Sequence, residues 1–220
     1  MYRAGPGAWW SQPEAARPAV LPVAAVRDAF RRWEGPRGVL EEAPAGAADL
    51  PGRPAAVLCA LFDEGGTAHV VLTRRSPALR SHTHQVSFPG GRVDPGEKPL
   101  DAALREAREE VGLDPSGLEV IGELSPLRTI ADPAPIRPFV AALPGRPLLR
   151  PNPAEVERAF SVALLELAEP DVYREEIWVA QGAERPMHFF ELDGDTVWGA
   201  TARMLRELLD VVLAAPGPPP

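Results

Sequence analysis

The stretch from Gly90 to Leu113 constrains the fold of this 220-residue chain more than any other part of the sequence. It reads GGRVDPGEKPLDAALREAREEVGL, in which Asp94-Pro95-Gly96 predicts a turn and Pro99 suits an early helical position, where a missing N–H costs nothing. Four apolar residues then recur at helical spacing and predict a helix over residues 99–111 with one face on a core: Leu100, Leu104, Ala107 and Val111. Gly112 suits the left-handed conformation that ends a helix.

Three carboxylates follow the border of this apolar face. Glu106 and Glu110 are four residues apart and therefore lie one turn apart on the same side, and Glu109 flanks them. Carboxylates this close repel one another, and a divalent cation with oxygen ligands, such as Mg²⁺, relieves that repulsion. The alternative is an ordinary solvated helix face. Arg105 is placed to pair with Glu109 or with Glu97 in either case.

Charge and cysteine content narrow the classes of partner. The formal net charge is −8, which argues against a general binder of nucleic acid or of membrane surfaces. An anionic small substrate would have to be held by local arginines and a bound cation. Cys59 is the only cysteine, so no internal disulfide forms, and its apolar surroundings predict a buried, inert thiol.

No apolar stretch approaches the roughly 18 residues of a membrane-spanning helix. We therefore expect a cytoplasmic protein that acts on a small molecule, without a membrane or nucleic-acid partner. A homodimer is compatible with the sequence. The arginines before Asp28 leave an organelle transit peptide as the alternative.

The remaining pattern predicts one domain over residues 21–214, with a disordered leader at 1–20 and a flexible tail at 215–220. Residues 21–53 form an extension made of a helix over 22–34 and a loop. The other expected elements are strands at 55–62, 68–73, 119–127, 139–143 and 187–192, helical turns near 155 and 164, and a helix over 201–212. The irregular alternation after an early hairpin favours a mixed sheet covered by helices.

The spacing Gly91, Glu97, Arg105-Glu106, Glu109-Glu110 and Gly112 resembles the complete Nudix box. The resemblance implies the Nudix fold, an α/β/α sandwich with a mixed β-sheet between helices, and cleavage of a nucleoside diphosphate linked to another group. It implies Mg²⁺, with Mn²⁺ as a substitute, held by Glu106, Glu109 and Glu110. Glu97 and Arg105 would support the helix and its loop, and Gly90 and Gly91 would supply backbone contacts.

The segment before the box reads VLTRRSPALRSHTHQVSFPGG and resembles the signature of coenzyme A pyrophosphatases. This resemblance implies substrate binding by Arg75, Arg80, His82, Phe88, Gly90 and Gly91. His84 stands where the signature has glycine. If that glycine provides a positive φ, histidine carries a modest penalty; if it allows close approach of the substrate, a side chain now fills the space.

A general base is the least determined part of the site. Glu155 and Glu157 lie in a segment that resembles the one where many Nudix enzymes place an extra acid, and Glu155 is the residue we include in the site. An acid at a helix start is the alternative. At the level of function, the alternatives are hydrolysis of ADP-ribose or NADH and a non-catalytic ligand sensor on the same scaffold.

Overall fold

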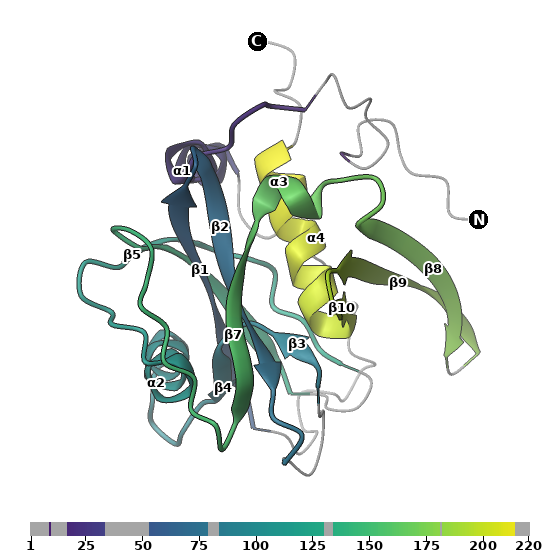
Figure 1. Ribbon diagram of the computed structural model, residues 1–220. Coiled ribbons are helices and arrows are strands. Elements are labelled where there is room, and N and C mark those ends of the chain that lie inside the picture. Colours follow the sequence, from purple (N-terminus) through teal and green to yellow (C-terminus); the bar gives the residue numbers. More distant parts are fainter. Residues whose placement is uncertain are drawn as a thin grey trace.

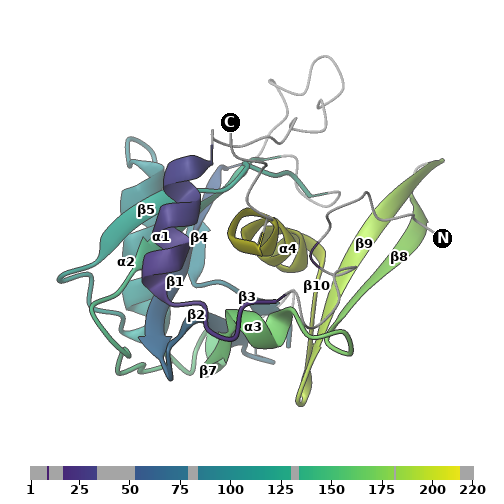
Figure 2. The ribbon, with the colours of Figure 1, turned by 90° about the horizontal axis from the view of Figure 1, so that it is seen from above.

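The computed structural model describes residues 9, 17–33, 53–78, 84–129, 134–180 and 182–213. A seven-stranded mixed sheet lies between helix α2 on one face and helices α1 and α4 on the other (Figure 1). A second, three-stranded sheet lies on the far side of α4 (Figure 2). The predicted α/β/α arrangement with a mixed sheet is therefore confirmed.

The elements run along the chain in the following order: α1 (Val23–Arg32), β1 (Ala55–Glu64), β2 (Thr67–Arg75), β3 (Val86–Ser87), β4 (Gly90–Arg92), α2 (Pro99–Val111), β5 (Glu119–Glu123), β6 (Ile136–Ala142), β7 (Val156–Ala163), α3 (Leu164–Leu167), β8 (Tyr173–Ala180), β9 (Ala183–Leu192), β10 (Asp195–Trp198) and α4 (Gly199–Leu213). Among the described residues, no helix is long and apolar enough to cross a membrane.

Strand β1 is the centre of the large sheet. It pairs antiparallel with β2 at one edge and parallel with β6 at the other, while its start, over Ala55–Val57, also pairs with β4. The order β3-β2-β1-β6-β5 is completed by β7, which pairs antiparallel with β2. The Gly90–Arg92 strand is thereby fixed beside the middle of the sheet, directly before α2.

Alternation along β1 creates two cores, because successive side chains point to opposite faces. Leu58 and Phe62 lie in the cluster that packs against Ala103 and Ala107 of α2. Cys59 lies in the other cluster, with α1 and α4, where it is a free thiol with no exposed surface. The prediction of a buried thiol is confirmed, and burial raises its pKa well above the usual value.

Helix α2 begins at Pro99 and ends at Val111, as the sequence predicts, and Gly112 adopts a left-handed φ of 65°. Near Glu155 the chain makes a single turn, in which the Val156 N–H donates to the Asn152 carbonyl at 2.8 Å; it does not continue as helix, because Val156–Ala163 is a strand and helix returns only at Leu164–Leu167. The segment fits a strand because its residues alternate and β2 offers an open edge along its length. Strand β8 was not predicted, because the charged residues in YREEIWVA obscure the alternation of apolar and polar side chains that is typical of a strand.

The predicted leader contributes one residue to the core. Trp9 is only 2% exposed, and its ring lies 5.0 Å from that of Tyr173 at the start of β8. Most of residues 1–20, and the tail at 215–220, fall outside the described residues.

Candidate active site

The acidic helix is joined to the sheet by a very close glycine contact. A Cβ atom on Gly91 would lie 2.4 Å from the carboxylate carbon of Glu106, and one on Gly90 would lie 2.4 Å from the carbonyl oxygen of Ala56. Glycine is required at Gly90, where the clash is with backbone, whereas a side chain at Gly91 would push the Glu106 carboxylate out of its place. The pair lets strand β4 run against β1 while the Glu106 carboxylate rests on its backbone.

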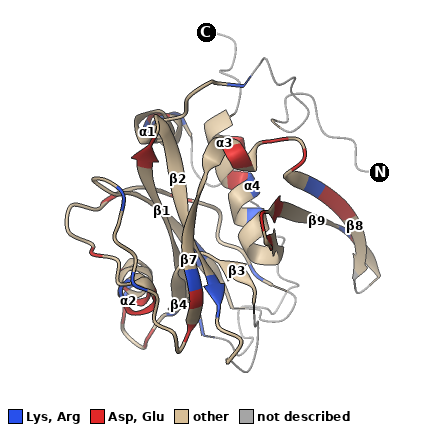
Figure 3. Cartoon of the chain, viewed as in Figure 1, with Lys and Arg blue, Asp and Glu red and all other residues tan. Residues whose placement is uncertain are grey.

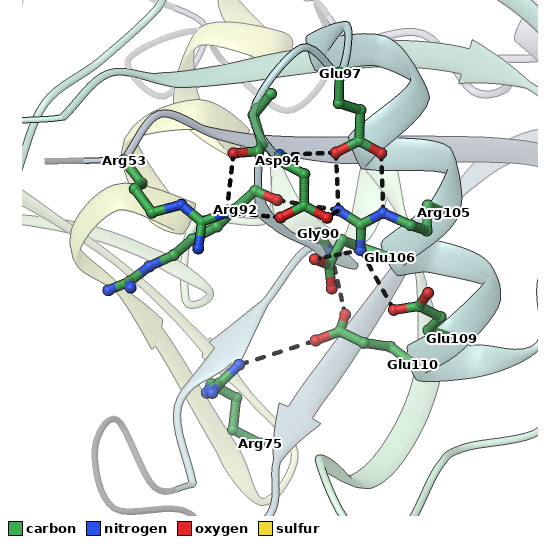
Figure 4. Close-up of polar contacts among 11 residues, drawn as sticks. Arg53, Arg75, Gly90, Arg92, Asp94, Glu97, Arg105, Glu106, Glu109 and Glu110 are labelled. Carbon is green, nitrogen blue, oxygen red and sulfur yellow. Dashed lines mark hydrogen bonds and ion pairs between the residues drawn. The ribbon is translucent and has the colours of Figure 1, made fainter.

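Arg105 locks the turn before the helix. Its Nε and Nη2 atoms donate to the two carboxylate oxygens of Glu97 at 2.9 and 3.0 Å, and Nη2 also donates to the Arg92 carbonyl at 3.1 Å (Figure 4). The backbone N–H of Asp94 donates to the same carboxylate at 2.9 Å. The hydrogen bonds from Arg105 and then Asp94 lower the pKa of Glu97 to about 2.

The same guanidinium contacts two of the three predicted metal ligands. Arg105 Nη1 lies 2.8 Å from Glu106 Oε1 and 3.3 Å from Glu109 Oε2. Both alternatives for the partner of Arg105 are therefore realised at once. Within the described residues, no three acidic, histidine or cysteine side chains converge in a way that could hold a metal ion.

Glu110 lies on the other side of this cluster and is nearly buried, with 3% of its surface exposed. Its Oε2 accepts from the Gly90 N–H at 3.1 Å, and its Oε1 lies 3.9 Å from Nη1 of Arg75 on β2 (Figure 4). Burial raises the pKa of Glu110 to about 7, although Gly90 and Arg75 act in the opposite direction. Repulsion from Glu106 and Glu155 raises it further.

These residues fit a divalent cation by their chemistry. The donors are carboxylate oxygens on one helix, which suit Mg²⁺ or Mn²⁺. The ionised form of Glu110 is poorly stabilised by the protein alone, and the glycine contact holds Glu106 beside it. A cation held by Glu106 and Glu109 would compete with Arg105 for their oxygens. Arg105 would still have its two hydrogen bonds to Glu97, which join the helix to its loop.

The two candidates for the base are placed in different surroundings. Glu155 is close enough to Glu110 to raise its pKa, and its carbonyl accepts from the N–H of Ser76 at 2.8 Å. Glu157 instead pairs with Arg74, whose Nε lies 3.1 Å from Glu157 Oε2. Of the two acids, Glu155 is the one beside the acidic helix.

Arg75 contributes a cation from the neighbouring strand. Its side chain is 29% exposed, and its Nε is buried without a hydrogen-bond partner among the described residues. Phe88 is 1% exposed and packs in the core shared with α4, so its side chain is placed for packing and not for contact with a substrate. Arg80 and His82 fall outside the described residues.

His84 is the single non-glycine residue with a positive φ in the described part of the chain, at 60°. Its N–H donates to the Arg75 carbonyl at 3.1 Å, and the Arg75 N–H donates to the Gln85 carbonyl at 3.0 Å. Two residues thus oppose one, which is the geometry of a β-bulge whose first position normally holds glycine. The observed φ agrees with the first of the two explanations, a backbone conformation that favours glycine, and the space taken by the imidazole is a separate effect.

Two supporting contacts were not anticipated from the sequence. The Asn152 N–H donates to the Glu110 carbonyl at 2.8 Å, and the Arg150 N–H donates to that of Val111 at 2.7 Å. The loop before β7 therefore satisfies the end of α2 and brings Glu155 toward the site. No sequence pattern indicates these contacts, because they join residues some 40 positions apart.

The fold and the acidic helix define a class of protein, and comparison with known families identifies it. The NUDIX domain profile matches residues 52–181, and the chain belongs to this family of Nudix hydrolases, enzymes that act on pyrophosphate bonds. Nudix hydrolases generally use divalent metal ions.

Among individual proteins, the chain is 38% identical over 144 residues to an uncharacterized Nudix hydrolase NudL from Photorhabdus laumondii, covering 65% of this chain and 76% of that one. It is 34% identical over 171 residues to Nudix hydrolase 22, chloroplastic, from Arabidopsis thaliana, covering 74% of this chain and 57% of that protein's length. A solved structure of the Nudix hydrolase RenU from M. smegmatis is 26% identical, with a TM-score of 0.46, over 53% of this chain and 73% of that one.

Proposed function

We propose that this enzyme is a Mg²⁺-dependent pyrophosphohydrolase that cleaves coenzyme A or acyl-coenzyme A into 4′-phosphopantetheine and adenosine 3′,5′-bisphosphate. The observation that carries the proposal is the position of Arg75, whose guanidinium lies 3.9 Å from the buried carboxylate of Glu110. Arg75 belongs to the segment that resembles the coenzyme A signature, and it places a phosphate-binding group beside the acidic helix.

The site residues would have separate roles in metal binding, helix positioning, phosphate binding and proton transfer. Glu106, Glu109 and Glu110 would hold the cation, which neutralises the diphosphate and provides a water nucleophile at neutral pH. Arg105 and Glu97 keep the helix in register with its loop. Arg75 would bind a substrate phosphate through its Nη atoms, since its side chain is 29% exposed. Glu155 would accept the proton from the attacking water, since it lies near Glu110 and forms no ion pair with any described residue.

The second candidate is hydrolysis of ADP-ribose or NADH. The feature that favours it is His84, because a side chain now stands where the coenzyme A signature has none, next to Arg75. Coenzyme A carries a 3′-phosphate and a long pantetheine arm that would need space beside Arg75, whereas ADP-ribose and NADH have neither group. A non-catalytic sensor is the third candidate, and the complete set of acidic residues argues against it.

A substrate panel tests these alternatives directly. The purified protein is incubated with Mg²⁺ and coenzyme A, acetyl-coenzyme A, ADP-ribose or NADH, and the products are identified by mass spectrometry. We expect the two halves of coenzyme A and no other cleavage. Efficient turnover of ADP-ribose or NADH without turnover of coenzyme A would replace the first candidate by the second, and no turnover of any substrate with Mg²⁺ or Mn²⁺ would favour the sensor.

A further inference from the structure

The three-stranded sheet β10-β9-β8 has one face against which no described helix or strand packs, although Phe189 on it is only 6% exposed. Tyr173, His188 and Phe190 share the face that packs on α4, since the Tyr173 ring lies 5.2 Å from that of Phe190 and His188 is 6% exposed. Because side chains alternate along a strand, their neighbours point away from α4. Figure 2 shows the β8–β9 hairpin on the far side of α4 from the large sheet.

The outer face of this sheet is rich in large apolar side chains, which are Trp178 of β8, Met187 and Phe189 of β9, and Trp198 of β10. Trp178 and Trp198 are 44% and 40% exposed, among the most exposed large apolar side chains of the described chain. Phe189 is the register partner of both Arg174 and Trp198. It is covered by the Arg174 guanidinium, 4.0 Å above its ring, and by Trp178 at 5.9 Å.

The charged residues of this face balance. Arg174 and Arg185 lie on it with Glu176 and Glu191, so its net charge is zero while the chain as a whole carries −8. Figure 3 shows both signs side by side on β8. Arg174 already pairs with Glu176 and Glu191, so the face exposes aromatic rings between ion pairs that are satisfied.

We propose that this outer face, defined by Trp178, Met187, Phe189 and Trp198, is the surface through which two copies of the chain associate. Two acidic chains repel except where charge is locally balanced, and this face is neutral and carries both signs, which makes it self-complementary under a twofold axis. Nucleic acid and anionic membranes would need a positive surface, which is not present here. Tryptophan, methionine and arginine are the residues that interfaces favour.

The area of this outer face sets the affinity that we expect for the dimer. At about 3.3 Å per residue and about 4.8 Å between strands, the 10 residues of β9 and its two neighbours span roughly 33 by 14 Å. That footprint is smaller than the roughly 800 Å² per partner of a standard stable interface, even with allowance for side-chain relief. We therefore expect a reversible dimer with a dissociation constant in the micromolar range.

Sedimentation velocity of the full chain between about 1 and 100 µM is the test, with the 23.7 kDa monomer as reference. We expect the average mass to approach twice this value as concentration rises. Trp178→Ser and Trp198→Ser should each weaken association at least tenfold. Leu148→Ser is the matched control, since Leu148 is 75% exposed in the loop beside α2, remote from this sheet. It should associate like the wild type.

A cross-linking measurement keeps the test decisive if a tryptophan variant folds poorly. Met187→Cys, at the centre of the face, should give covalent dimers with a short bismaleimide, whereas Ser116→Cys, in the exposed loop after α2, should not; native Cys59 is buried and stays unreactive. A chain that stays monomeric at 100 µM would overturn the proposal. So would a dimer that keeps its affinity in Trp178→Ser and is cross-linked through Ser116→Cys instead. Neither result depends on which substrate is cleaved.

Discussion

Glu97 and Glu110 belong to the same motif, and their pKa values move in opposite directions. Arg105 and the Asp94 N–H hold the pKa of Glu97 at about 2, whereas burial raises that of Glu110 to about 7. Glu97 receives two guanidinium hydrogen bonds and supports the loop. Glu110 is removed from water with one backbone N–H and a distant guanidinium, so its charge is left for a ligand to stabilise. The difference separates an acid that maintains the loop from one that we propose takes part in the chemistry.

The largest expected effect is the loss of catalysis when one of the acids proposed to bind the metal is replaced. Glu110→Gln and Glu109→Gln should each abolish Mg²⁺-dependent hydrolysis, because each removes an anionic oxygen donor while keeping the shape of the side chain. Turnover of the substrate found in the panel is the measurement, and circular dichroism should show an unchanged fold. Unchanged turnover in both variants would mean that the metal is bound elsewhere.

In the absence of metal, the stability of Glu110→Gln relative to the wild type should depend on pH. A folded-state pKa raised above the unfolded value of about 4.5 contributes stability that is present below pH 4.5 and lost as the pH rises through 7. Glutamine has no such loss. Between pH 4 and pH 8 the variant should therefore gain on the wild type by on the order of 3 kcal/mol in urea unfolding with EDTA present. A constant difference across this range would show that Glu110 is ordinarily solvated.

The stability contribution of Glu97 depends on pH in the opposite direction to that of Glu110. Its lowered pKa contributes stability that is present above pH 4.5 and lost as the pH falls toward 2. Arg105→Lys removes the forked contact to Glu97 and should lower the stability of the fold at pH 7, with a smaller loss below pH 4. Glu97→Gln offers the matched variant from the other side of the contact. If Arg105→Lys unfolds like the wild type at pH 7, the contact does not hold the loop.

The smallest effect should come from the strained bulge. His84→Gly relieves a left-handed conformation and should stabilise the chain by about 0.5–1 kcal/mol, after allowance for the extra flexibility of glycine when unfolded. His84→Asn, which tolerates this region, should stay close to the wild type. Thermal unfolding of the three proteins is the measurement. A destabilised His84→Gly would indicate that the imidazole makes a contact worth more than the strain.

The same variant sharpens the choice of substrate. If the His84 side chain restricts the space beside Arg75, His84→Gly should improve kcat/KM for coenzyme A relative to ADP-ribose. An equal change for both substrates would place the side chain away from the bound molecule.

The sequence by itself determined helix α2 from Pro99 to Gly112, because turn, proline, periodicity and terminal glycine are all local signals. It also determined the Nudix family, through the spacing of the acids. Only the tertiary structure decided that Glu110 is buried against Gly90 while Arg105 engages Glu106 and Glu109. It also placed Glu155, and not Glu157, beside them. These outcomes depend on which strands pair with β1 and β2, and pairings between distant residues leave no local trace in the chain.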